Sequence, residues 1–158
     1  MGLFYWNTLG PLAFKDGSWN GTVYTNILEA HMLPFWKKLN SRNENQENEL
    51  PNNNYIFQED NAPIHTSSVA VAWKQKNNIN TQKWPPQSPD LNPIEHVWKV
   101  LKQRINHRKN PPRNKEQLIQ AINEEWNNIE SGFLDNLINS MPTRVQQVLD
   151  ANGWHTRY

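Results

Sequence analysis

Residues 55–65 read YIFQEDNAPIH, and residues 84–98 read WPPQSPDLNPIEHVW. In the first stretch, alternating positions place Tyr55 and Phe57 on one face of a strand and Asp60 on the other. The Asn-Ala-Pro run after Asp60 ends the strand, because proline has no amide hydrogen to give to a sheet. The stretch therefore predicts a strand over 55–60 that ends in a carboxylate.

The second stretch predicts the start of a helix. Asn92 is a residue type favoured at a helix N-cap, and Pro93 fits the first helical position. Apolar side chains then recur at helical spacing on one stripe: Ile94, Val97, Trp98, Leu101 and Ile105. The proline-rich residues 85–89 are expected to form a stiff extended loop before the cap.

Upstream of these stretches, the sequence predicts a hairpin and a helix. Leu3–Trp6 and Leu12–Lys15 are interpreted as two strands, joined by a turn over Asn7–Gly10. Thr22 is expected to cap the following helix, and Pro34 to end or kink it. The polar, Asn- and Glu-rich residues 37–54 are expected to form an exposed loop.

The remaining segments alternate between helix and strand. A helix over Ser67–Lys76 and a short strand over Ile79–Trp84 precede the proline-rich loop. After a proline-broken linker over 110–113, the predicted elements are helical: one begins at a capping box of Asn114 and Gln117, and two shorter ones cover 133–139 and 143–151, with Gly153 as a stop. This order is typical of an α/β fold with a mixed sheet.

The composition limits the function classes. The 158 residues include no cysteine, which excludes disulfides and cysteine-based zinc sites and favours an intracellular location. No apolar run is long enough to span a membrane, so we expect no membrane partner. The net charge of +1 says little about nucleic acid either way, because the distribution of charge matters more than its sum.

Three side chains near the two opening stretches are candidates for chemistry. Asp60 lies where functional groups collect in α/β sheets, but it could equally open a turn. Glu95 is the third residue of its helix, where a carboxylate can bond back to the cap, and it also lies on the flank of the buried stripe. His65 can approach the same strand end, or serve as a hydrogen-bonded structural residue, and it is also a candidate contact to DNA. Two carboxylates suit a hard cation such as Mg²⁺, and a site for two ions would need a third acid.

A basic run follows Glu95 along the chain. It comprises Lys99, Lys102, Arg104, Arg108, Lys109 and Arg113. The run is either a solvated helix face and loop or a strip that contacts DNA phosphates.

The two opening stretches, with the KVLK of residues 99–102, resemble the signature blocks of the Tc/mariner transposases, which are DDE enzymes with a ribonuclease H-like fold. The resemblance extends to residues 9–12, 24–35, 140–144 and 156–158. It implies that Asp60 and Glu95, with thirty-four residues between them, are the second and third catalytic, metal-binding carboxylates. It also implies two Mg²⁺ or Mn²⁺ ions, and DNA (transposon ends and target) as the partner.

The chain departs from the family pattern at its beginning. The first catalytic Asp of the family and its helix-turn-helix region lie upstream of the segment that matches Gly2–Trp6, and Asp16 is no substitute. We interpret 1–158 as a partial catalytic domain, with 1–110 as the remaining core and 111–158 as C-terminal helices. The fold expected is a ribonuclease H-like mixed sheet flanked by helices, lacking its central first strand, with a helical tail. Reduced stability is expected from the missing strand, since its neighbours would be left unpaired.

The functional expectation has two forms. In the first, the chain belongs to a transposase that cleaves and transfers DNA strands, acts in the nucleus and forms a homodimer, although this portion by itself is expected to be inactive. In the second, it is a transposon-derived protein that binds nucleic acid or a partner without catalysis. A third interpretation, an α/β protein with no retained role, is separated from the second by salt-dependent binding to duplex DNA.

Overall fold

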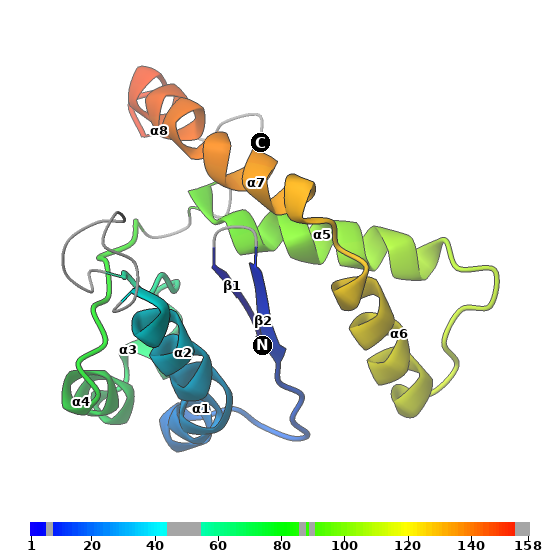
Figure 1. Cartoon of the computed structure of the whole chain (residues 1–158), viewed down its shortest axis with the longest axis horizontal. Coiled ribbons are helices and arrows are strands. Elements are labelled where there is room, and N and C mark those ends of the chain that lie inside the picture. Colours follow the sequence, from blue (N-terminus) through cyan, green and yellow to red (C-terminus); the bar gives the residue numbers. More distant parts are fainter. Residues whose placement is uncertain (6–7, 44–54, 86–87, 89–90, 154–158) are drawn as a thin grey trace. The chain divides into compact units, whose positions relative to one another are not determined.

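The computed structural model of the chain describes residues 1–5, 8–43, 55–85, 88 and 91–153. Its helices and strands, which are labelled in Figure 1, fall into two units. The terminal unit comprises Met1–Phe14 and Ser88–Tyr158, and the central unit comprises Lys15–Gln87. Some predicted features lie outside the described residues: Trp6 and Asn7 of the hairpin, residues 44–54 of the polar loop, parts of the proline-rich loop, and residues 156–158.

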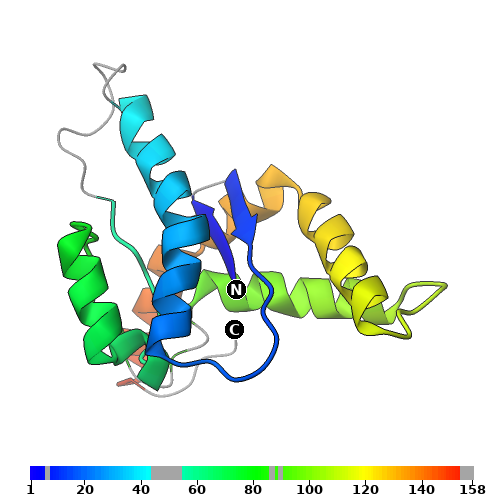
Figure 2. The same cartoon turned by 90° about the horizontal axis from the view of Figure 1, so that it is seen from below.

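A continuous helical rod begins the central unit. α1 (Gly21–Ile27), the π-helical turn η1 (Leu28–Met32) and α2 (Leu33–Asn43) follow one another without a break, as Figure 2 shows. The wide turn comes directly before Pro34, whose ring crowds the carbonyl four residues back. In the π turn the Leu33 amide donates to the Leu28 oxygen, five residues back, which relieves that crowding. The helix therefore widens before Pro34 and does not end there.

Two boundaries of this rod differ from the sequence predictions. The N-cap is Asn20, whose side chain accepts a hydrogen bond from the Val23 amide at 2.9 Å, so the prediction of Thr22 as the cap was wrong. The prediction of a loop beginning at residue 37 was also wrong for residues 37–43, which are helical. Leu39, the one apolar residue of this stretch, is buried, and its burial favours the helix although the polar composition favours a loop.

The rest of the central unit packs against α1. The short helix α3 spans Pro63–Thr66, and α4 spans Ser68–Lys76 with Ser67 as its N-cap, which confirms the predicted helix. The prediction of strands over 55–60 and 79–84 was wrong, because the two extended segments meet only in one isolated parallel bridge, Phe57 with Thr81. Phe57 is buried and Ile56 is exposed, as the predicted alternation requires.

A two-stranded antiparallel hairpin begins the terminal unit. β1 spans Gly2–Tyr5 and β2 spans Thr8–Leu12, with Tyr5 opposite Thr8. The hairpin confirms the sequence prediction, but the prediction that Thr8–Gly10 form a turn and that 13–15 belong to the strand was wrong. The observed register brings Phe4, Leu9 and Leu12 against the core, and burial of apolar side chains selects one register over another.

Four helices complete the terminal unit: α5 (Pro93–Asn106), α6 (Lys115–Asn127), α7 (Ser131–Asn139) and α8 (Met141–Asp150). Three predicted boundaries are found: Asn92 is the N-cap position of α5, although its side chain makes no capping hydrogen bond, Asn114 accepts from the Gln117 amide at 2.9 Å, and Gly153 follows α8 with a positive φ of 84°. Gln117 also accepts from the amide of Arg113, the residue before the cap, and not from the Asn114 amide as in a standard capping box.

The core of the terminal unit lies along α5, beside which the hairpin is drawn in Figures 1 and 2. Its buried members are Val97, Leu101, Trp126, Ile129, Leu134 and Leu137. The predicted stripe of α5 is confirmed, since Val97 and Leu101 are buried and Ile94 and Trp98 pack against them. None of the helices in the described part of the chain is long and apolar enough to cross a bilayer.

Candidate functional site

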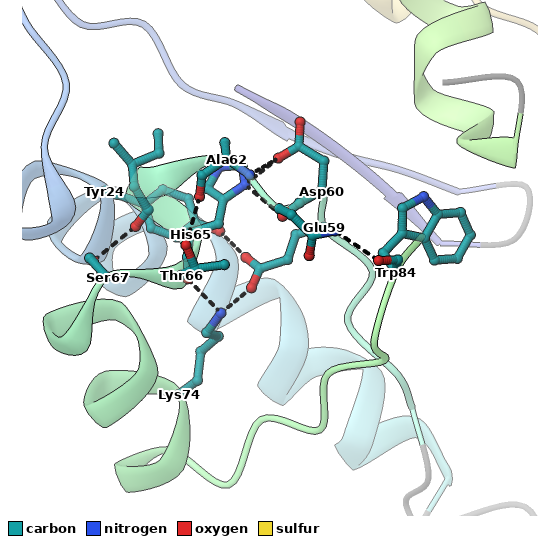
Figure 3. A network of polar contacts seen from close by, with 11 residues as sticks. Tyr24, Glu59, Asp60, Ala62, His65, Thr66, Ser67, Lys74 and Trp84 are labelled. Atoms are coloured by element: carbon teal, nitrogen blue, oxygen red, sulfur yellow. Dashed lines mark hydrogen bonds and ion pairs between the residues drawn. The ribbon is translucent and has the colours of Figure 1, made fainter. Parts of the chain in front are cut away.

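Asp60 ends the extended segment of the central unit and stands exposed at its tip. Its side chain is 58% exposed. The Ala62 amide donates to Asp60 Oδ1 at 3.0 Å, so the carboxylate closes a local turn before α3. His65 Nδ1 lies 2.7 Å from the same oxygen, as Figure 3 shows. Asp60 therefore opens a turn through one oxygen and remains accessible to solvent, while its functional role stays a prediction.

His65 lies between the carboxylate and a buried tyrosine. Its ring centroid is 4.5 Å from that of Tyr24, with the two planes tilted by 40°. The side chain of His65 is 20% exposed, and its Nδ1 is also 3.3 Å from the backbone oxygen of Asp60. The prediction that His65 approaches the strand end is confirmed. These contacts show His65 as a hydrogen-bonded residue, which is the structural alternative considered for it.

A buried polar network lies beneath this pair, and the sequence analysis missed it. Lys74 Nζ pairs with Glu59 Oε1 and donates to the His65 carbonyl at 3.0 Å. The Tyr24 hydroxyl donates to the other oxygen of Glu59 at 2.5 Å. Burial, together with the negative charge of Glu59, raises the pKa of Tyr24 well above its usual range.

The alternation of the predicted strand contained the signal for this network. Period two places Glu59 on the same face as Phe57, which is the buried face. A carboxylate on a buried face requires a cation or donors, because a bare buried charge is very costly. On α4, Lys74 lies one turn after the fully buried Ala70 and so reaches that face.

Glu95 lies in the first turn of α5 in the terminal unit. Its backbone amide donates to the Asn92 oxygen at 3.1 Å, as expected for the third residue of the helix. Glu95 is exposed, and within the described ranges its carboxylate makes no hydrogen bond or ion pair. The capping role considered for this side chain, a bond back to the Asn92 amide, is therefore not formed. A negative charge here still interacts favourably with the positive end of the helix dipole.

His96, the next residue of α5, is held by the C-terminal motif of residues 140–144. Arg144 is 3% exposed; its Nη1 donates to His96 Nε2 at 2.6 Å, and its Nε donates to Ser140 Oγ at 2.8 Å. Arginine has no acceptor atom, so Nε2 is the acceptor and the ring proton is on Nδ1. This contact ties α8 to the first turn of α5.

The basic run divides into engaged and exposed side chains. Arg104 donates to the Asn128 oxygen at 3.2 Å, and Arg108 pairs with Glu124 and Glu125. The hydrogen bond between Arg108 and Glu124 raises the pKa of the guanidinium and lowers that of the carboxyl. The lysines of the run, Lys99, Lys102 and Lys109, are exposed.

A pocket of about 430 Å³ lies at the corner between α5 and α6. Arg108, Lys109, Arg113 and Glu124 are among the residues that line it. Most of its lining is neutral, and its charged residues are three basic side chains and Glu124, which pairs with Arg108.

Asp60 and Glu95 lie in different units, so their convergence on one metal site stays a prediction. Within the described ranges, no group of three or more His, Asp or Glu side chains lies close enough to hold a metal ion. The donor chemistry of both residues nevertheless fits a divalent cation. Each presents an exposed carboxylate, and the described side-chain contacts of Asp60 use Oδ1, which leaves Oδ2 for a hard ion.

Comparisons with known proteins identify relatives over nearly the whole chain. Residues 5–119 match the model of the DDE superfamily endonucleases. The chain is 35% identical to the transposable element Tcb1 transposase of Caenorhabditis briggsae and to the Tc1 transposase of Caenorhabditis elegans, over 99% of its own length and 53% of theirs. It therefore spans about half the length of these relatives.

The fold also matches a solved structure. The catalytic domain of Mos1 transposase, determined with raltegravir and Mg, superposes with a TM-score of 0.75 at 19% identity, over 89% of this chain and 67% of that one. The expected ribonuclease H-like α/β fold is thereby confirmed.

Proposed function

The chain belongs to the DDE superfamily endonucleases, as a transposase domain homologous to the Tc1 and mariner enzymes, and we propose that it acts in DNA transposition by metal-dependent cleavage and transfer of DNA strands. The observation that carries the proposal is the placement of two exposed carboxylates within the matched residues 5–119. Asp60 ends an extended segment, and Glu95 stands in the first turn of a helix.

Asp60 and Glu95 would hold divalent ions, Mg²⁺ or Mn²⁺, through carboxylate oxygens. The Mos1 catalytic domain was determined with Mg, which supports divalent metal use in this family. When bound, a pair of such ions activates the attacking oxygen and stabilises the leaving oxygen of a phosphodiester. The role of this chain is to position the two carboxylates. A turn and His65 hold Asp60, and helix α5, which packs in the core of its unit, carries Glu95.

DNA is the proposed substrate, and the exposed lysines of the basic run are its proposed phosphate contacts. Lys99, Lys102 and Lys109 have side chains directed to solvent, whereas Arg104 and Arg108 are engaged by groups of the protein. We therefore assign the electrostatic share of DNA binding to the lysines. Homodimerisation and nuclear location follow from the same proposal.

Metal binding provides the first test. Titration of the 158-residue chain with Mn²⁺, followed by the electron paramagnetic resonance of the free ion, should show binding that Asp60→Asn and Glu95→Gln each weaken by about tenfold or more. Glu116→Gln is the matched control, because Glu116 also occupies the first turn of a helix, α6, and lies on the surface. Equal Mn²⁺ binding by the parent chain and both site variants would reject the metal-binding role.

DNA binding provides the second test. Changing to alanine a lysine that contacts a phosphate should reduce the magnitude of the slope of log affinity against log salt concentration by about one. Lys76→Ala on α4, outside the basic run, is the control. Salt-dependent duplex binding without Asp60-dependent Mn²⁺ binding would instead support the alternative, a transposon-derived DNA-binding protein without catalysis.

A further inference from the structure

Three separate segments of the central unit converge on the pair formed by Asp60 and His65. Tyr24 comes from α1, Glu59 from the extended segment, and Lys74 from α4, and Figure 3 shows all three around His65. We propose that Tyr24, Glu59 and Lys74 are positioning residues that hold His65 and, through it, fix the carboxylate of Asp60 in the orientation that a metal ion requires. This inference rests on the proposed function, in which Asp60 is a metal ligand.

Lys74 joins the two chain segments on either side of Asp60. It pairs with Glu59, the residue before Asp60, and donates to the carbonyl of His65, five residues after Asp60. The side chains of Lys74 and Glu59 are 9% and 11% exposed. Two charges withdrawn from water in this way need well-placed partners, because removing one leaves the other uncompensated. Lys74 therefore links the two ends of the turn between Glu59 and His65.

Tyr24 fixes the histidine ring itself. Its ring packs against that of His65, and its hydroxyl donates to Glu59. Tyr24 is 1% exposed, so neither contact can shift without opening the core around α1. With its ring packed against Tyr24 and its backbone held by Lys74, His65 directs Nδ1 at Asp60 Oδ1.

As a consequence, Oδ1 of Asp60 accepts hydrogen bonds within the protein, and Oδ2 is available to a metal ion. The Ala62 amide and His65 Nδ1 both converge on Oδ1. Outer hydrogen bonds of this kind set the orientation of a carboxylate ligand, and their loss typically weakens metal affinity by about 10–100-fold. A network with only a structural role would stabilise the central unit without controlling this carboxylate.

Hydrogen exchange of the Ala62 amide reports the orientation of Asp60 without metal. Its rate, measured by NMR in the whole chain, is divided by that of the Leu28 amide, which belongs to a fully buried residue of the same unit. The ratio should rise about fivefold to tenfold in Lys74→Met, because the bond from Ala62 to Asp60 is lost. It should also rise in the double variant Glu59→Gln/Lys74→Met, in which no unpaired buried charge remains and folding is preserved.

Variants of Tyr24 and Trp73 complete this test. Tyr24→Leu removes the contact with the His65 ring and should raise the ratio, whereas Tyr24→Phe keeps that contact and should change it by less than about twofold. Trp73→Phe is the matched control and should leave the ratio unchanged, because the Trp73 indole donates to Glu29, which is outside this network. An unchanged ratio in Tyr24→Leu and in both Lys74 variants would overturn the proposal.

Mn²⁺ binding separates this inference from the function on which it rests. The double variant should bind Mn²⁺ about tenfold more weakly than the parent. Failure of Asp60→Asn to reduce Mn²⁺ binding would reject the proposed function, while the exchange ratio would still decide the positioning role. Unchanged Mn²⁺ affinity in the double variant, in a chain where Asp60→Asn does lose binding, would show that the network is structural only.

Discussion

Trp126 joins the hairpin of the terminal unit to α5, the helix that carries Glu95, and its replacement gives a prediction with a definite magnitude. The residue is 3% exposed, its ring stacks on Trp98 at 5.4 Å, and its Nε1 donates to the Gly10 oxygen at 3.1 Å. Trp126→Phe keeps the stacked ring and removes the donor. The lost hydrogen bond costs about 1 kcal/mol of unfolding free energy. The void of roughly 40 Å³ adds about 1 kcal/mol at about 24 cal/mol per Å³.

Trp126→Phe should therefore lower the free energy of unfolding by about 2 kcal/mol, and Trp126→Ala by about 4 kcal/mol. Urea denaturation followed by far-ultraviolet circular dichroism is the assay, because the eight tryptophans of the chain would confuse a fluorescence signal. Leu149→Ala is the control: Leu149 is 63% exposed on α8, and its loss should cost less than about 0.5 kcal/mol. A cost for Trp126→Phe below about 0.5 kcal/mol, or equal to that of Trp126→Ala, would refute the reasoning.

Three further predictions concern packing and pH. Gly2→Ala should lower the free energy of unfolding by about 1–3 kcal/mol in the same urea assay, since an added Cβ would lie 2.6 Å from Cη2 of Trp98; an unchanged urea midpoint would contradict it. The raised pKa of Tyr24 means that folding favours its neutral form. The free energy of unfolding should therefore fall as the pH rises above 10.0, the ordinary pKa of tyrosine, and it should fall less steeply in Tyr24→Phe. Identical dependence of the urea midpoint on alkaline pH in the parent and the variant would disprove this. The lowered pKa of Glu124 gives the opposite sign: the stability from its pair with Arg108 is present above the ordinary value of 4.5 and is lost as pH falls below it, so Glu124→Gln should show a weaker acid dependence in urea midpoints than the parent.

Most local features of the fold could be predicted from the sequence. The cap at Asn114, the start of α5 after Asn92, the stripe of α5 and the alternation around Phe57 all follow from preferences within a few residues, which the local sequence contains. The cap error at Thr22 was local, since Asn20 lies two residues away, but two other errors arose where a distant contact outweighed local preference. Leu39 draws polar residues 37–43 into α2, and core packing sets the register of the hairpin.

The candidate site shows the same division. The sequence by itself determined that Asp60 ends an extended segment, that Glu95 begins a helix, and that both lie in a transposase-type domain. Only the tertiary structure decided which groups hold Asp60. Lys74 is fifteen residues from Glu59, and Tyr24 is thirty-five, so no local pattern pairs them. A buried carboxylate must find its cation and donors somewhere in the fold, and the packing of α1 and α4 around the segment determines which residues these are.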